Sequence, residues 1–309
     1  MIETLELQGA VPVLHLDTLA EDARSKGSGF RLQIESWGFM AAEIPGIGAY
    51  TTRLMGAFSA ACGSTSPRLL DYAATLTPQV TSAGNHGFYK FNSEIPRLAQ
   101  GVPDPKEFLH VSGAMIDDVP TGSHAVLEAF PDIERGSVFL FNVGFILANI
   151  IGDEIRAMLP GEPPGLNLSR HSTTLRVIHY KDFDDREVLA HEHSGIQMLG
   201  VQFPPSDGGL QYILHDGTWV EPCIKGTDVV LCNVGRMLAQ ASGGRLRPST
   251  HRVHRSGPPR GTDRSSVVLF VHPDHNGRQW RIEADRTTYL DATWGDFVSS
   301  GFRGIGLRT

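Results

Sequence analysis

Residues 189–199, "LAHEHSGIQML", contain two histidines, His191 and His193, separated by one residue. The surrounding residues are typical of a β-strand, in which residues i and i+2 point to the same face. Both imidazoles then face one space and Glu192 faces the other way, provided that the strand is regular. A pair of solvated or hydrogen-bonded histidines is the simpler interpretation, because a chain with 13 histidines can contain such a pair by chance.

Short β-rich segments surround this stretch from residue 173 onward, and glycine, proline and aspartate separate them. They include "TTLRVIHY" (173–180), "GGLQYIL" (208–214), "DVVLCNVG" (228–235), "THRVH" (250–254) and "SSVVLFVHP" (265–273). Strands at this spacing predict a sandwich or barrel of antiparallel strands.

The first half of the chain has more helical patterns. Residues 18–38, 50–62 and 66–76 predict helices, and residues 11–17 and 39–44 predict short strands. The apolar stretch 136–158 has helical periodicity, which asparagines interrupt, and we expect a buried scaffold helix rather than a membrane span. Residues 158–172 predict a loop rather than a linker. We therefore expect one domain, 1–309, with a helix-rich N-terminal part (1–172), a core (173–275) and a C-terminal helix and tail (276–309).

Composition restricts the class of partner and the compartment. The chain is 40% hydrophobic with a net charge of −7, which argues against nucleic acid or an anionic membrane as a partner. The three cysteines, Cys62, Cys223 and Cys232, match no zinc spacing and favour free thiols. The N-terminus has early acidic residues and no long apolar run, so no secretory signal is expected and the protein is expected to be cytoplasmic.

Three further residues follow in a fixed order. "STHRV" (249–253) places His251 on a strand, and "DRSSVVLF" (263–270) places Arg264 and Ser266 on one strand face. This order resembles the isopenicillin-N-synthase-like branch of the Fe(II)/2-oxoglutarate-dependent oxygenases. Members have a histidine–any–aspartate pair, a "GGLQV" hairpin, an "S-HRV" histidine and an arginine–any–serine pair. "SWGFMAAEI" (36–44) and "LRVIHY" (175–180) also resemble family segments, so the resemblance covers nearly the whole chain.

The resemblance implies a fold that is mainly β with flanking helices: a double-stranded β-helix, or jelly roll. It implies Fe(II) as the metal, with His191 and His251 as ligands and open positions for 2-oxoglutarate and O2. Arg264 and Ser266 would bind the far carboxylate of 2-oxoglutarate, and Tyr180 would donate a hydrogen bond nearby. No catalytic side chain is expected beyond the metal ligands.

The chain departs from the family at position 193, where a histidine stands in place of the aspartate. His193 is either a third ligand, or it occupies the position without binding metal, or Glu192 or an acid from elsewhere completes the set after a local bulge. We take His191, His193 and His251 as the ligand set, which requires a regular strand around 191–193. His254 lies three residues beyond His251 and is expected to face away.

Substrate contacts are less specific. The family's substrate-binding neighbourhood corresponds to Asn85, Tyr89 and Lys90, and the C-terminal segment 293–306 resembles a closing helix whose Phe302 and Arg303 are lid candidates.

The function expected from these residues is oxidation of a small-molecule metabolite by hydroxylation, desaturation or cyclisation, in secondary metabolism. One alternative is an isopenicillin-N-synthase-like oxidase that uses no 2-oxoglutarate. Another is a non-catalytic relic that binds a small molecule. We expect a small-molecule substrate, no nucleic acid, no membrane, and a monomer or homodimer.

Overall fold

The computed structural model describes residues 13–15, 29–63, 79–81, 84–94, 102–117, 130–181, 187–222, 226–255 and 263–303. The helix predicted over 66–76, the first part of the one predicted over 18–38, and Cys223 lie outside these residues. Within them, Cys62 and Cys232 are free and buried, as the sequence predicts.

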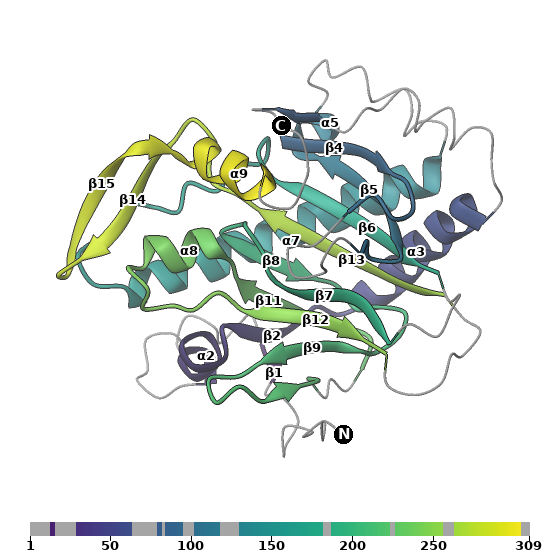
Figure 1. Ribbon diagram of the computed structural model, residues 1–309, viewed down its shortest axis with the longest axis horizontal. Coiled ribbons are helices and arrows are strands. Elements are labelled where there is room, and N and C mark those ends of the chain that lie inside the picture. Colours follow the sequence, from purple (N-terminus) through teal and green to yellow (C-terminus); the bar gives the residue numbers. More distant parts are fainter. Residues whose placement is uncertain are drawn as a thin grey trace.

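Two β-sheets form the centre of the molecule (Figure 1). The larger sheet, in spatial order, consists of β1 (Val13–Leu14), β2 (Phe39–Glu43), β11 (Val229–Val234), β8 (Leu199–Gln202), β13 (Arg264–Val271), β6 (Thr174–Tyr180), β5 (Lys106–Ser112), β4 (Gly84–Tyr89) and β3 (Gln79–Thr81). The smaller sheet consists of β10 (Trp219–Val220), β9 (Leu210–Ile213), β12 (Thr250–His254) and β7 (Val188–Ser194). Almost all neighbours are antiparallel, and the predicted jelly roll is confirmed.

Helices cover the outer face of the larger sheet (Figure 1). The helix α3 (Ile47–Gly63) packs on β6 and β13, and α7 (Pro131–Met158) packs on β6, β8 and β13. Gly144 of α7 permits close packing, because a Cβ there would lie 2.9 Å from the Leu269 side chain. By length and composition α7 could also cross a membrane, but its buried face belongs to the main core, as predicted for a scaffold helix.

The remaining helices are short. They are α2 (Gly29–Arg31), the π-helix η1 (Leu32–Trp37), α5 (Gly113–Ile116), α8 (Arg236–Ala241) and α9 (Trp294–Arg303). The segment η1 ends at Gly38, which adopts a left-handed conformation with φ 73°, so this helix ends where the sequence predicts.

The C-terminal part contains a hairpin that the sequence did not predict. The strands β14 (Arg278–Glu283) and β15 (Arg286–Thr293) precede α9 and extend away from the two sheets (Figure 1). Their turn residues, Ala284 and Asp285, both have positive φ, at 46° and 61°. Such turns are usually recognised by Asn-Gly or Asp-Gly, and Ala-Asp lacks that signal. The part of the chain predicted to be helix-rich likewise contributes β1 to β5 to the larger sheet.

Candidate functional site

A cavity of about 1030 Å³ lies between the two sheets. The larger sheet contributes residues of β5, β6 and β13 to its wall, and the smaller sheet contributes residues of β7 and β12. Its size is that of a pocket for a small organic ligand. His193, His251, Arg264, Ser266 and Tyr180 all line it, whereas the predicted ligand His191 does not.

His193 and His251 lie directly opposite each other on β7 and β12, with ring centroids 4.4 Å apart. The Nδ1 atom of His193 lies 2.7 Å from the carbonyl oxygen of His191, and Nδ1 of His251 lies 3.1 Å from that of Ser249. A carbonyl oxygen can only accept a hydrogen bond, so each Nδ1 carries the proton. In a neutral ring, Nε2 is then the free lone pair.

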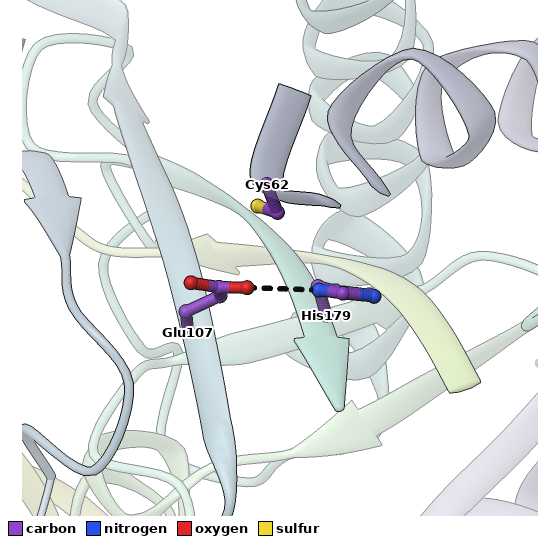
Figure 2. A group of neighbouring side chains, drawn as sticks. All are labelled: Cys62, Glu107 and His179. Atoms are coloured by element: carbon purple, nitrogen blue, oxygen red, sulfur yellow. Dashed lines mark hydrogen bonds and ion pairs between the residues drawn. The ribbon is translucent and has the colours of Figure 1, made fainter. Parts of the chain in front are cut away.

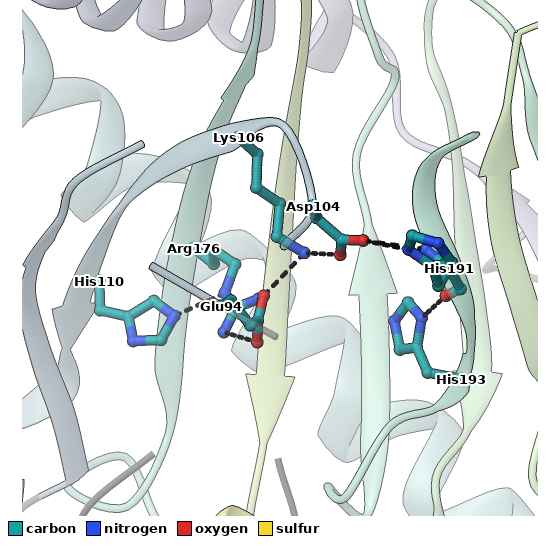
Figure 3. Close-up of polar contacts among 7 residues, drawn as sticks. All are labelled: Glu94, Asp104, Lys106, His110, Arg176, His191 and His193. Atoms are coloured by element: carbon teal, nitrogen blue, oxygen red, sulfur yellow. Dashed lines mark hydrogen bonds and ion pairs between the residues drawn. The ribbon is translucent and has the colours of Figure 1, made fainter. Parts of the chain in front are cut away.

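His191 shows the same arrangement. Its Nδ1 lies 2.7 Å from Oδ1 of Asp104, so the carboxylate accepts a hydrogen bond from the ring (Figure 3). All three imidazoles therefore have Nδ1 occupied by an acceptor. Metal-binding histidines usually have this second contact, which fixes the tautomer and leaves the other nitrogen for the metal.

Two of the rings are kept uncharged by their surroundings. Burial, followed by the neighbouring His193, lowers the pKa of His251 to about 3. Desolvation within the cavity, followed by the charge of Lys106, lowers the pKa of His193 from its ordinary value. Because only a neutral imidazole can bind a metal, these shifts favour ligation near neutral pH.

The strand that carries the histidine pair is not regular, contrary to the expectation for a ligand pair. His251 pairs with His193 but Val253 pairs with Ala190, so three steps along β7 match two along β12. This β-bulge inserts a residue at 191–192 and changes the direction of the side chains. Among the described residues, His191, His193 and His251 do not bring three ligand atoms within 4.8 Å of one another.

The donor chemistry nevertheless fits Fe(II). Imidazole nitrogens are suitable ligands for this ion, and the neutral rings of His193 and His251 are already adjacent. The ligand roles of His191, His193 and His251 stay predictions. His254 does not line the cavity, and its Nε2 lies 3.7 Å from Glu187, as expected for a residue that faces away.

The Arg264 side chain is suited to bind an anion. It is 5% exposed, its Nε donates to the carbonyl oxygen of Gly208 at 2.9 Å, and its buried Nη1 has no hydrogen-bond partner among the described residues. Burial lowers the pKa of Arg264 from its ordinary value, which shows that the charge is desolvated. Tyr180 pairs with Arg264 in the sheet register, with its ring 5.5 Å from the guanidinium carbon. A carboxylate would satisfy this guanidinium, so the site fits 2-oxoglutarate.

Sequence reasoning missed a chain of buried charges on the cavity wall (Figure 3). Lys106 contacts Asp104 at 2.8 Å and Glu94 at 2.7 Å, and Glu94 contacts Arg176 at 3.2 Å. Burial alone would raise the pKa of Glu94, but Arg176 and Lys106 lower it well below its ordinary value. Asp104 and Lys106 are two residues apart, but Glu94 and Arg176 are 82 residues apart, so no local pattern predicts the whole chain of contacts.

Two of the predicted substrate residues, Tyr89 and Lys90, do not line the cavity. Tyr89 is buried and stacks on Phe108 with a centroid distance of 4.4 Å, and neither Tyr89 nor the exposed Lys90 lines the cavity. Asn85 lies in β4, but its side chain is outside the described part. The same holds for Phe302 and Arg303 at the end of α9, although α9 does reach the cavity through Val298.

A second cluster, Cys62, Glu107 and His179, does have the spacing of a metal site (Figure 2). It lies on the face of β6 opposite Tyr180, beneath α3. Both ring nitrogens of His179 face carboxylates. Nδ1 lies 3.0 Å from Oε1 of Glu107, and Nε2 lies 2.8 Å from Oδ2 of Asp263. Burial, followed by Glu107, raises the pKa of the Cys62 thiol, which disfavours the thiolate that binds metal. These contacts indicate a structural ion-pair cluster.

Comparisons with known proteins agree with the fold. Residues 172–273 match the family described as the 2OG-Fe(II) oxygenase superfamily. A probable iron/ascorbate oxidoreductase of Dictyostelium discoideum is 34% identical over 129 residues, which are 40% of this chain and 34% of that protein. A 2-oxoglutarate-dependent dioxygenase of Amanita muscaria is 34% identical over 110 residues, 33% of this chain and 52% of that protein. The chain thus spans about a third to a half of these relatives.

Solved structures match over nearly the whole chain. A full-length protein of Neurospora crassa, crystallised in complex with alpha-KG, has a TM-score of 0.71 at 17% identity and covers 98% of this chain and 100% of its own. The dioxygenase for auxin oxidation from rice has a TM-score of 0.67 at 16% identity and covers 96% of each chain. At these identities the likeness establishes the fold.

Proposed function

We propose that this chain is a member of the 2OG-Fe(II) oxygenase superfamily and acts as an Fe(II)- and 2-oxoglutarate-dependent oxygenase of a small molecule. The observation that carries the proposal is one cavity that contains two adjacent neutral imidazoles, His193 and His251, and Arg264, whose buried Nη1 has no hydrogen-bond partner among the described residues. A relative named as a 2-oxoglutarate-dependent dioxygenase and a structural neighbour complexed with alpha-KG support it.

Each of the predicted site residues has a task in this proposal. His191, His193 and His251 would hold Fe(II), and Arg264 with Ser266 would orient the far carboxylate of 2-oxoglutarate. When bound, the metal supplies the activation of O2 that is coupled to oxidative decarboxylation of the cosubstrate. The sheets exclude bulk water and position one C–H bond of the substrate. A small molecule fits the cavity volume, and the Neurospora protein has also been crystallised with thymine.

An anaerobic titration tests the proposal. Adding 2-oxoglutarate to the protein with Fe(II) should produce a visible metal-to-ligand charge-transfer band, and admitting O2 should produce succinate. A protein that binds Fe(II) but never develops the band would instead be an oxidase that takes all electrons from its substrate.

A non-catalytic relic is the second candidate, and the absent carboxylate at position 193 favours it. It predicts that 2-oxoglutarate binds without succinate formation under O2, with Fe(II) and ascorbate present. Succinate above the level of an Arg264→Met variant would rule against it.

A further inference from the structure

Asp104 contacts His191 at two points (Figure 3). Its Oδ1 accepts the ring Nδ1–H at 2.7 Å and the backbone N–H at 3.2 Å. One carboxylate oxygen thus fixes both the orientation of the ring and the position of the strand at the bulge. The side chain of Asp104 is 2% exposed, so water does not weaken the contact.

A buried network holds Asp104 in place. Its Oδ2 accepts from Lys106 at 2.8 Å, Lys106 also contacts Glu94 at 2.7 Å, and Glu94 contacts Arg176 at 3.2 Å. The side chains of these three partners are at most 10% exposed. Two acids and two bases are thus paired with one another in this buried network. Burial alone would lower the pKa of Lys106, but Asp104 and Glu94 raise it above its ordinary value.

We propose that Asp104 is the positioning carboxylate of the metal centre. It contacts the ligand His191 rather than the metal, and it supplies the negative charge that residue 193 lacks. This inference rests on the proposed metal-binding function. A carboxylate that accepts the Nδ1–H of a ligating histidine fixes its tautomer and makes Nε2 a more basic donor. The contact thereby compensates for a ligand set composed only of neutral imidazoles.

Metal affinity is the direct measure of this role and needs neither cosubstrate nor turnover. We would titrate the full chain with Co(II) and follow binding by calorimetry and by the visible spectrum. Asp104→Asn keeps the size of the side chain and removes its charge. We expect it to weaken Co(II) binding by about 10- to 100-fold, the usual effect of removing such a partner.

Glu107→Gln is the matched control. It alters another buried carboxylate–histidine contact, that of Glu107 with His179 at 3.0 Å, outside the cavity. It should leave Co(II) affinity unchanged. The melting temperature of each metal-free variant verifies that the fold is retained.

A double-mutant cycle separates the electrostatic role from a structural one. His193→Asp puts a carboxylate directly into the ligand set, so Asp104→Asn should cost about threefold or less in that background. An equal loss in both backgrounds would mean that Asp104 only supports the strand, and would overturn the inference. Unchanged affinity in the folded Asp104→Asn variant would also overturn it. A wild-type chain that binds no Co(II) would instead refute the metal-binding function itself.

Discussion

Replacing Arg264 by methionine should remove the stabilisation of the protein by 2-oxoglutarate without harming the ligand-free fold. The guanidinium is 5% exposed and its Nη1 has no hydrogen-bond partner among the described residues. A buried charge without full compensation destabilises the folded state. Methionine fills similar volume without that charge, so the melting temperature of the ligand-free variant should equal or exceed that of the wild type.

The expected size of the effect follows from the contact. A hydrogen bond to a charged group contributes about 1.5–3 kcal/mol, and its loss should weaken 2-oxoglutarate binding about 100-fold. At a ligand concentration 100 times the wild-type Kd, binding stabilises the wild type by about 2.7 kcal/mol and the variant by about 0.4 kcal/mol. For 309 residues these values correspond to rises in Tm of about 4 °C and below about 1 °C.

Thermal unfolding across a series of 2-oxoglutarate concentrations measures both values. Arg252→Met is the control, because Arg252 lies on β12 next to His251 but does not line the cavity, and its Nε donates to Gln211 at 2.9 Å. The same rise in Tm for the wild type and Arg264→Met would refute the assignment of Arg264. A loss of the rise in Arg252→Met as well would show that the effect is not specific to the cavity.

Three further outcomes are expected. His251→Ala should lose Co(II) affinity while His254→Ala retains it in a calorimetric titration; the reverse result would mean that the other histidine is the ligand. His193→Asp should retain or improve metal binding, whereas His193→Ala should weaken it. Unchanged metal affinity in His193→Ala would exclude His193 as a ligand. Burial and His275 lower the pKa of His272 to about 3 in the folded state, below the value near 6.5 of the unfolded chain. The unfolded chain therefore binds the proton first, so this contribution to stability is complete above about pH 6.5 and falls by about 2 kcal/mol at pH 5. Urea unfolding at about pH 6.5 and at about pH 5 should show a smaller loss of stability for His272→Gln than for the wild type. An equal loss in the two proteins would contradict the assignment of this contribution to His272.

The sequence predicts those features that depend on local periodicity and on the order of motifs. Arg264 and Ser266 lie on one face of β13, as alternation requires, and both line the cavity. His251 lies on β12 and also lines the cavity, as the sequence predicts. The helix over 136–158 is present, although it begins at Pro131, because a proline is well tolerated in the first turn.

Features that depend on distant parts of the chain were not predictable. Asp104 and His191 are 87 residues apart, and nothing in either segment indicates the other. The direction in which each side chain of β4 points is equally hidden in the sequence, since a shift of one residue exchanges the two faces of a strand. Phe88 faces the main core and Tyr89 packs against Phe108, so the expected substrate contact is instead part of a small aromatic cluster.

The histidine at position 193, the bulge and Asp104 form one structural unit. The bulge turns the His191 carbonyl oxygen toward the ring of residue 193, where it accepts the Nδ1–H at 2.7 Å. An aspartate has no such proton and would bring a negative oxygen close to that carbonyl. The same bulge presents the backbone N–H of His191 to Asp104 at 3.2 Å. Asp104 thus contacts the bulge, and the bulge provides the acceptor for His193. In the proposed metal centre, the negative charge lies on Asp104 instead of on residue 193. The histidine at position 193 is therefore understandable only together with Asp104, a residue far away in the sequence that contacts the bulge directly.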